Sequence, residues 1–133
     1  MGVKIKARYT GDDTVELEHG PSGKRISTDL PVDNGGRGRT FSPTDLLGAS
    51  LASCILTIMS KGAAKDGLDM TGASIEIDKE MAASPRRVAR FVGTLVLPAH
   101  LTEPQKEKLK AYIKACPVSA SLHPDVKVEL TVR

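Results

Sequence analysis

Aromatic side chains are scarce in this sequence, and tryptophan is absent. Aromatic residues make up 3% of the 133 residues. Proteins that bind single-stranded nucleic acids stack the bases on aromatic rings along a basic groove. The formal net charge is only +3, and the lysines and arginines are scattered along the chain, as on an ordinary solvated surface. The composition therefore argues against a nucleic-acid partner.

The sequence also lacks the common motifs of metal, phosphate and serine-nucleophile sites. It contains no Cys-x-x-Cys or His-x-x-x-His spacing, and His19, His100 and His123 are far apart, so a zinc site is not indicated. No nucleophile-elbow pattern accompanies any serine. The glycine-rich segment 30–39 does not have the spacing of either phosphate-binding glycine motif. We expect neither a metal nor another cofactor.

A hydrophobic run long enough to span a membrane is missing as well. The uncharged stretch between Asp45 and Lys61 is shorter than the roughly 20 residues that span a bilayer, and it contains several hydroxyl side chains. At the N-terminus, apolar residues alternate with lysine and arginine, which is the pattern of a strand and not of a signal peptide. These features predict a soluble cytoplasmic protein with no membrane partner.

The length of 133 residues indicates one domain, residues 1–133, large enough to fold around a hydrophobic core without covalent staples. Cys54 and Cys116 are its only cysteines. In a reducing compartment two cysteines are more often free than bridged. Any disulfide between them is therefore expected to be transient and catalytic rather than structural.

Hydrophobic periodicity and turn residues divide the chain into strands and helices. Ser42, Pro43 and Asp45 form a helix start with a capping-box spacing, and Thr102 and Gln105 form another. The expected elements are strands over residues 1–9, 14–19, 24–28, 73–81, 87–97 and 125–133, a long apolar helix over 42–62, an amphipathic helix from 102 and a short helix over 117–122. Strands outnumber helices, which indicates an α+β fold.

The two cysteines have different surroundings. Cys54 lies about three turns inside the long helix, beyond the reach of its N-terminal dipole. Pro117 disfavours a helical Cys116 and places it at or next to the start of the short helix, a setting that lowers a thiol pKa. By local sequence alone, Cys116 is the better candidate for a reactive thiol. The alternative for both is burial as small hydrophobic residues, the commoner fate of free cysteines.

A reactive Cys54 would need a cation brought close by the fold. Arg37 and Arg39 are the candidates, because the glycines around them allow the loop to approach closely whatever it covers. The alternative is that this loop is a flexible connector. Asp45 is expected to do no more than cap its helix, unless an arginine pairs with it and the pair reaches the thiol.

Two segments resemble a known family. Residues 41–54 (FSPTDLLGASLASC) and residues 115–119 (ACPVS) are similar to the OsmC/Ohr family of osmotically inducible and organic hydroperoxide resistance proteins. A helix start of Pro-x-acid-Leu-Leu with a cysteine nine residues after the acid, followed by a distant Cys-Pro, is fairly specific. The order of the predicted elements also matches the family over nearly the whole chain.

The resemblance implies an OsmC-like fold, an intertwined homodimer in which antiparallel sheets wrap around long central cysteine-bearing helices. It implies that Cys54 is the peroxidatic and Cys116 the resolving cysteine. Cys54 would reduce a small-molecule hydroperoxide and become a sulfenic acid, which Cys116 condenses to a disulfide. A dithiol reductant, such as a lipoylated protein, would restore the thiols. An apolar pocket of Leu47, Leu51, Ile58 and their symmetry mates in the dimer would favour organic hydroperoxides.

The chain departs from the organic hydroperoxide branch of that family at two places. That branch has Glu directly after the helix-opening proline and an Arg in an N-terminal glycine turn. Here Thr44 follows Pro43, and the turn over residues 10–13 contains no arginine. Asp45 with Arg37 or Arg39 would have to substitute, which places the chain nearer the general OsmC-like members. A non-catalytic binder of small apolar molecules and a redox sensor are the alternative functions.

Overall fold

The computed structural model describes residues 2–133. This part of the chain falls into two compact units, one up to residue 46 and the other from residue 47 to the C-terminus. We describe each unit by itself. That both belong to one domain, as the length predicts, stays a prediction.

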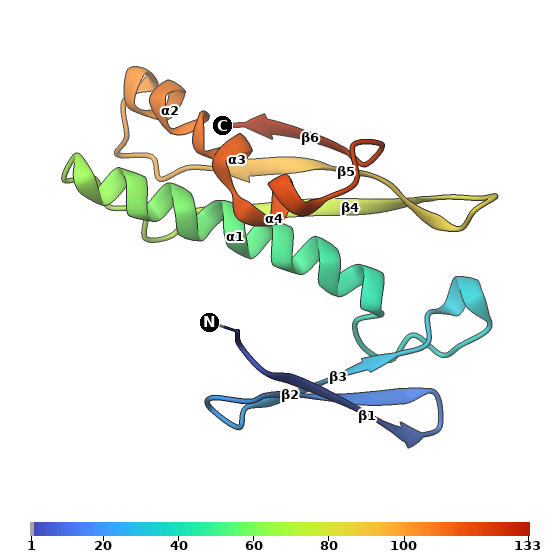
Figure 1. The fold of residues 1–133 in the computed structure, drawn as a ribbon. Helices are drawn as coiled ribbons and strands as arrows, with labels where there is room; N and C mark the ends of the chain where they lie inside the picture. Colours follow the sequence, from blue (N-terminus) through green and yellow to red (C-terminus); the bar gives the residue numbers. More distant parts are fainter. Residues whose placement is uncertain (1) are drawn as a thin grey trace. The chain divides into compact units, whose positions relative to one another are not determined.

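The first unit is an antiparallel three-stranded sheet followed by a folded loop (Figure 1). Its strands are β1 (Ile5–Gly11), β2 (Thr14–His19) and β3 (Arg25–Asp29), paired in that order. A short 3-10 helix, η1 (Val32–Asn34), follows β3 within the glycine-rich segment. This pairing confirms the predicted hairpin and third strand. The alternation of side chains and the turn residues between the strands had indicated both.

The two faces of this sheet differ in polarity. On one face Tyr9 pairs with Val15 and Leu17 pairs with Ile26, so neighbouring apolar side chains gather there. Within this chain they stay open to solvent: Ile5 is 74% exposed, Tyr9 65% and Ile26 58%. The opposite face bears ion pairs between the strands, namely Lys6–Glu18, Arg8–Glu16 and Arg25–Glu18.

The second unit combines a three-stranded sheet with helices. Helix α1 (Pro43–Lys65) begins at the end of the first unit and continues through the second. The other elements, in chain order, are β4 (Ser74–Ala82), β5 (Arg87–Val96), α2 (Glu103–Leu109), α3 (Tyr112–Ala115), α4 (Pro117–Ser121) and β6 (Lys127–Val132). The sheet order is β4-β5-β6.

One strand pair differs from the antiparallel sheets that were expected. β6 lies parallel to β5, with Phe91 opposite Val128 and Leu95 opposite Val132. The segment between these strands contains α2, α3 and α4, and a crossover of this kind brings the chain back to the end of the sheet where β5 began, as parallel pairing requires. The alternation in β6 could not reveal this, because side chains alternate with period 2 in both kinds of pairing.

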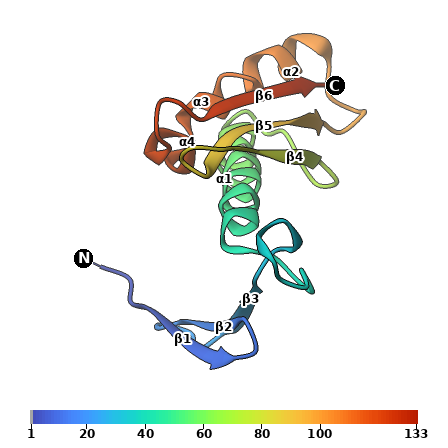
Figure 2. The ribbon, with the colours of Figure 1, turned by 90° about the vertical axis from the view of Figure 1, so that its right-hand side faces the viewer.

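The core of the second unit lies between α1 and one face of this sheet. Phe91 and Leu95 of β5 are fully buried there together with Leu51, Ile55 and Met59 of α1. Figure 2 shows the sheet on one side of α1. By length and composition alone α1 could cross a membrane, since it continues beyond the uncharged stretch that the sequence analysis considered. One side of α1 packs against the sheet as part of the hydrophobic core.

The helix boundaries follow the predicted capping signals. Thr102 caps α2: its hydroxyl accepts from the Gln105 N–H at 3.3 Å, and its own N–H donates to the Gln105 side chain at 2.8 Å. The amphipathic segment is divided, however, because the chain leaves α2 after Leu109 and re-forms a helical turn at Tyr112. The predicted break before Pro117 is confirmed.

Candidate functional site

The two cysteines lie side by side in the second unit. Both are free thiols, Cys54 half-buried on α1 and Cys116 fully buried between α3 and α4. The Cys54 thiol is close enough to Cys116 to raise the pKa of its thiol through a side-chain hydrogen bond. A disulfide requires two cysteines whose side chains face one another at short range, and this proximity fits that requirement.

The backbone around Cys116 explains how its sulfur reaches α1. Cys116 is extended, as expected before proline, and it is the N-cap of α4. The Ser119 N–H donates to its Sγ at 3.4 Å. The sulfur thereby points back into the core cluster that also contains Leu51 and Ile55.

Burial outweighs the local effect of the helix start on Cys116. Removal from water raises the pKa of the Cys116 thiol, and its hydrogen bond with Cys54 adds to this, while the N–H groups of Ser119 and Val118 act in the opposite direction. The local sequence favoured Cys116 as the reactive thiol because it could not show this burial. A thiol with a raised pKa is a poor first nucleophile but remains suited to attack an oxidised neighbour.

Asp45 caps α1, as the sequence predicts. The Ser42 N–H donates to Asp45 Oδ2 at 2.9 Å, and the Asp45 N–H donates to Ser42 Oγ at 3.1 Å. This reciprocal pair is the capping-box arrangement with Asp in place of Glu. Ser42 is almost fully buried, so the cap fixes the direction in which the chain enters the cysteine helix.

The glycine-rich loop is a folded element of the first unit. Gly36 and Gly38 donate their N–H groups to the carbonyls of Pro31 and Leu30, at 2.9 Å and 3.0 Å. These bonds turn the chain so that the arginines on either side of Gly38 come back to the hairpin. Of the two interpretations of the loop, the structure therefore favours the one in which it places its arginines.

Arg39 joins the loop to the sheet. Its Nε and Nη2 donate to the two oxygens of Asp29 at 2.8 Å and 2.9 Å, and its backbone N–H donates to Asp29 Oδ2 at 2.8 Å. Its Nη1 and Nη2 also donate to the side chain and carbonyl of Asp12, at 3.0 Å and 2.7 Å. Arg37 pairs with the same Asp12 carboxylate. The bidentate geometry holds the Arg39 guanidinium in one orientation.

This arginine cluster is defined by Asp12, Asp29, Arg37 and Arg39, and its formal charges cancel. The side-chain hydrogen bonds of Arg39 hold the pKa of Asp29 well below its usual range, and hydrogen bonds from Arg39 and then Arg37 lower the pKa of Asp12. Both carboxyl groups therefore stay ionised at neutral pH. The cluster fixes the loop electrostatically, but it contributes no net positive charge.

We expect Asp29→Asn to destabilise the protein at neutral pH and to reduce its loss of stability in acid. A lowered carboxyl pKa stabilises the fold at pH values above the unfolded pKa of about 3.9, and this stabilisation is lost as the pH falls through that value towards the folded pKa. Urea unfolding of both proteins at pH 7 and at pH 3 would measure this. The free energy of unfolding of the variant should be lower than that of the wild type at pH 7, and the difference between them should be smaller at pH 3.

Asp13→Asn is the matched control for this prediction. It makes the same change in the same unit, and within residues 2–133 the Asp13 carboxylate is a partner of neither Arg37 nor Arg39. Two results would contradict a role for Asp29 as the anchor of the loop. One is an equal loss of stability at pH 7 in Asp13→Asn. The other is a stability difference between wild type and Asp29→Asn that is the same at pH 3 as at pH 7.

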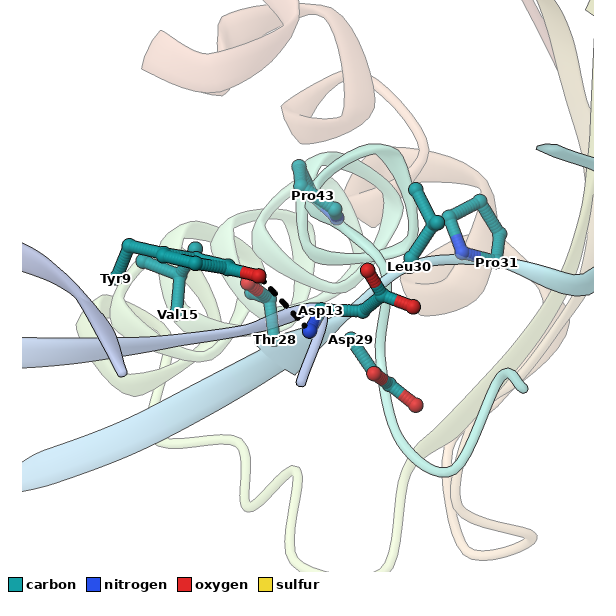
Figure 3. Close-up of a pocket in the computed structure, with 8 residues that line it drawn as sticks. All are labelled: Tyr9, Asp13, Val15, Thr28, Asp29, Leu30, Pro31 and Pro43. Atoms are coloured by element: carbon teal, nitrogen blue, oxygen red, sulfur yellow. Dashed lines mark hydrogen bonds between the residues drawn. The ribbon is translucent and has the colours of Figure 1, made fainter. Parts of the chain in front are cut away.

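A small apolar cavity lies beside the arginine cluster. Its volume is about 250 Å³. Figure 3 shows the aromatic ring of Tyr9 along one side of it, the Asp13 carboxylate near its centre and the Asp29 side chain turned away. The Asp13 N–H donates to the Tyr9 hydroxyl at 3.2 Å. The cavity is lined by Tyr9, Asp13, Val15, Thr28, Asp29, Leu30, Pro31 and Pro43.

The sequence analysis missed this cavity and expected an apolar pocket elsewhere. Leu51, one of the three residues predicted to line that pocket, is only 1% exposed and packs in the core, so it cannot present a surface to a ligand. The apolar alternation that includes Tyr9 and Val15 was the available signal for the cavity. It identified strands, but the approach of Pro31 and Pro43 to them depends on the tertiary fold.

The described residues do not meet the requirements of a metal site. Within residues 2–133, no three His, Cys, Asp or Glu side chains come together in a way that could hold a metal ion. The chemistry that this part of the chain offers is that of two adjacent thiols.

The family model for OsmC-like proteins matches residues 35–131 of this chain. The chain belongs to the OsmC-like protein family. The matched segment includes both cysteines, the cap of α1 and the elements of the second unit as far as residue 131, within β6. A candidate osmotic stress induced and detoxification response protein of Psychrobacter arcticus 273-4 is 38% identical in sequence, with a TM-score of 0.93 over 100% of this chain and 98% of that one.

More distant OsmC-like structures share the fold. An organic hydroperoxide resistance protein of Legionella pneumophila is 22% identical, with a TM-score of 0.77 over 99% of this chain and 96% of that one. An organic hydroperoxide resistance protein of Bacillus subtilis is 15% identical, with a TM-score of 0.69 over 100% and 98%. No curated protein sequence matches the chain. The α+β architecture around a long cysteine-bearing helix is therefore that of the OsmC-like fold.

Proposed function

We propose that this OsmC-like protein is a thiol-dependent peroxidase that reduces organic hydroperoxides, and hydrogen peroxide less well, in defence against oxidative stress. The observation that supports this most strongly is the contact between the Cys54 and Cys116 thiols. Two cysteines so far apart in the sequence meet at one point, the more accessible one on the central helix and the other sealed in the core. This is the arrangement that a peroxidatic and a resolving thiol need.

The reaction consists of two steps at these sulfurs. The Cys54 thiolate attacks the distal oxygen of the hydroperoxide, the O–O bond breaks, and an alcohol leaves with a proton while Cys54 becomes a sulfenic acid. The Cys116 sulfur then attacks the Cys54 sulfur. The S–O bond breaks, an S–S bond forms, and the hydroxyl leaves as water with the thiol proton of Cys116.

An external dithiol, such as dihydrolipoamide or a lipoylated protein, closes the cycle. One of its thiolates attacks the disulfide, and its second thiol then displaces the protein from the mixed disulfide, so that the dithiol leaves oxidised and both cysteines are reduced. The entering thiolate should attack Cys54, because Cys116 is 0% exposed.

We propose that the protein acts as a homodimer in the cytoplasm. Two apolar surfaces in this chain support a second copy as the partner. The apolar face of the first sheet is open, with Ile5 and Tyr9 mostly exposed, and exposed apolar patches of this kind mark sites of protein–protein contact. Only 33% of the most apolar stretch of α1 is buried within the chain. An apolar helix that is largely uncovered within one chain supports its packing against a second subunit.

Asp45, Arg37 and Arg39 are proposed to assist the activation of Cys54. Arg39 already has its charge matched by Asp29 and Asp12, whereas the acidic partner of Arg37 within residues 2–133 is Asp12 alone. We therefore expect Arg37→Ala to lower the second-order rate constant for Cys54 oxidation more than Arg39→Ala does, and Arg39→Ala to reduce stability more. The measurements are stopped-flow oxidation by cumene hydroperoxide and urea unfolding. Unchanged oxidation rates in both variants would remove the arginines from the site.

The proposed function is tested by the consumption of cumene hydroperoxide by the wild-type protein, with dihydrolipoamide as reductant and glutathione as the comparison. Steady turnover with the dithiol, and less with the monothiol, is the expected result. The two reductants differ in how they reduce the protein disulfide. The second thiol of a dithiol resolves the mixed disulfide intramolecularly, whereas a second molecule of a monothiol must collide with it. A folded protein that turns over with neither thiol would contradict the peroxidase proposal.

Binding of a small apolar molecule without catalysis is the second candidate function. The cavity of about 250 Å³ beside Tyr9 and Val15 supports it, because its lining is mostly apolar and a few polar groups could orient a ligand. Under this proposal, ligand binding would persist in Cys54→Ser, and hydroperoxide would not be consumed. A protein that forms the disulfide once per oxidation and is not recycled by either thiol would act as a redox sensor instead.

A further inference from the structure

A glycine on the cysteine helix receives an aromatic ring from the segment that carries the other cysteine. A Cβ atom at Gly62 of α1 would lie 2.2 Å from Cζ of Tyr112 and 2.6 Å from its Cε1 and Cε2. Real Cβ atoms do not approach other atoms so closely, so the ring of Tyr112 occupies the space of the missing side chain. Gly62 is buried by this contact.

The contact between Gly62 and Tyr112 joins the helix that carries Cys54 to the segment that leads to Cys116. Gly62 is about two helical turns beyond Cys54 on α1. Tyr112 is the first residue of α3, and α3 ends directly before Cys116. Leu109 fixes the end of the preceding helix by full burial. The Tyr112 ring therefore anchors the start of α3 on the helix that carries Cys54, and Ile113 beside it also packs against the core.

We propose that Gly62 and Tyr112 are positioning residues that hold Cys116 against Cys54 for the condensation of the sulfenic acid. This proposal rests on the proposed disulfide chemistry of these two cysteines. The ring of Tyr112 packs against Gly62. Because the short helix α3 connects Tyr112 to Cys116, this contact fixes the position of Cys116 as well. Neither residue is a reacting group, so the pair should affect the closing of the disulfide and leave the first oxidation of Cys54 alone.

The size of the expected effect follows from the geometry of the attack. Two reacting atoms held in place react far faster than two that must find each other, and a displacement of about 1 Å can lower a rate roughly 100-fold. A methyl group at Gly62 would have to push the Tyr112 ring away, because the ring atoms closest to it lie in the path of the Cβ atom. The turn at Cys116 would move with the ring.

The experiment measures the two oxidation steps separately in Gly62→Ala. Hydrogen peroxide is mixed with the reduced protein, and quenched samples are analysed by mass spectrometry for sulfenic acid, captured with dimedone, and for the Cys54–Cys116 disulfide. Formation of the sulfenic acid should stay within about two-fold of wild type, since the first step does not involve Cys116. Closure of the disulfide should slow by roughly 10- to 100-fold, with more dimedone adduct as a result.

Gly48→Ala is the matched control on the same helix. A Cβ atom at Gly48 would lie 2.9 Å from Cε1 of Phe91 on β5, so the substitution also crowds an aromatic ring in the core, but that ring belongs to the sheet. It should reduce stability and leave disulfide closure near the wild-type rate. Slowing by Gly48→Ala equal to that by Gly62→Ala would overturn the proposal, because it would show a general effect of core strain.

Two variants of Tyr112 keep the proposal testable if Gly62→Ala does not fold. Tyr112→Phe keeps all the ring atoms that face Gly62, so closure should stay near wild type. Tyr112→Ala removes the ring, so closure should slow, and adding Gly62→Ala to it should slow closure little further, because the methyl group then enters vacated space. Normal closure in a folded Tyr112→Ala variant would overturn the proposal.

Oxidation by diamide separates this proposal from the peroxidase function. Diamide takes two electrons and two protons from the two thiols and needs no activation of a hydroperoxide. One outcome is that the wild type consumes no hydroperoxide but forms the disulfide with diamide faster than Gly62→Ala does. That result would contradict the peroxidase proposal and support the positioning role of Gly62 and Tyr112. If instead hydroperoxide is consumed and Gly62→Ala forms the disulfide at the wild-type rate with both oxidants, the positioning role is contradicted and the peroxidase proposal is supported.

Discussion

Cys54→Ser is expected to abolish hydroperoxide turnover, with a fall of at least about 1,000-fold, because the attacking atom of the reaction is removed. A serine hydroxyl stays protonated at neutral pH and is a far weaker nucleophile towards a peroxide oxygen than a thiolate. The measurement is consumption of cumene hydroperoxide with dihydrolipoamide present in excess.

The substitution should leave the fold intact, so that the loss reports chemistry. Cys54 is half-buried on α1, and serine has nearly the same shape. A serine hydroxyl within a helix can donate to the carbonyl four residues earlier, as Thr57 already does to Ser53 at 2.8 Å. Unchanged urea unfolding and unchanged oligomeric state are the controls. Substantial turnover in a folded Cys54→Ser variant would show that the peroxidatic thiol lies elsewhere and would contradict the proposed mechanism.

Local sequence signals predicted most of the elements of this fold. Ser42 and Thr102 mark the two helix starts, and Pro117 marks the break after α3, because capping and proline geometry depend only on neighbouring residues. The strands were found in the same way, from side-chain alternation. The length of the amphipathic segment was overestimated, since nothing in its periodicity marks the turn between α2 and α3.

Contacts between distant residues could not be predicted from the residues alone. The pairing of Arg39 with Asp29 and Asp12, the parallel register of β6 and the seat of Tyr112 on Gly62 all join segments whose sequences carry no sign of the partner. The burial of Cys116 is of the same kind: its helix start favours a thiolate, and the core that surrounds it favours a thiol. The resemblance to a family supplied the pairing of the cysteines, because it brings in the tertiary fold.

Cys116→Ser is expected to leave the first oxidation of Cys54 intact and to stop the second. With no resolving thiol, the sulfenic acid of Cys54 should persist long enough to be captured by dimedone in nearly stoichiometric amount. Turnover should fall, because the reductant must now act on the sulfenic acid directly. In an excess of hydroperoxide Cys54 should be oxidised further to the sulfinic acid, which the thiol reductant does not reverse, so that activity declines during the assay.

The position of Cys116 makes serine an unusually informative replacement. Cys116 is the N-cap of α4 and accepts from the Ser119 N–H, and serine is a preferred residue at such a cap. The variant should therefore be folded, with α4 retained and a hydroxyl of similar size in contact with Cys54. Because the hydroxyl has no sulfur to form the second bond, any disulfide found in Cys116→Ser must join two subunits through Cys54. A Cys54 sulfenic acid that disappears as fast in this variant as in wild type, without overoxidation, would contradict the role of Cys116 as the resolving thiol.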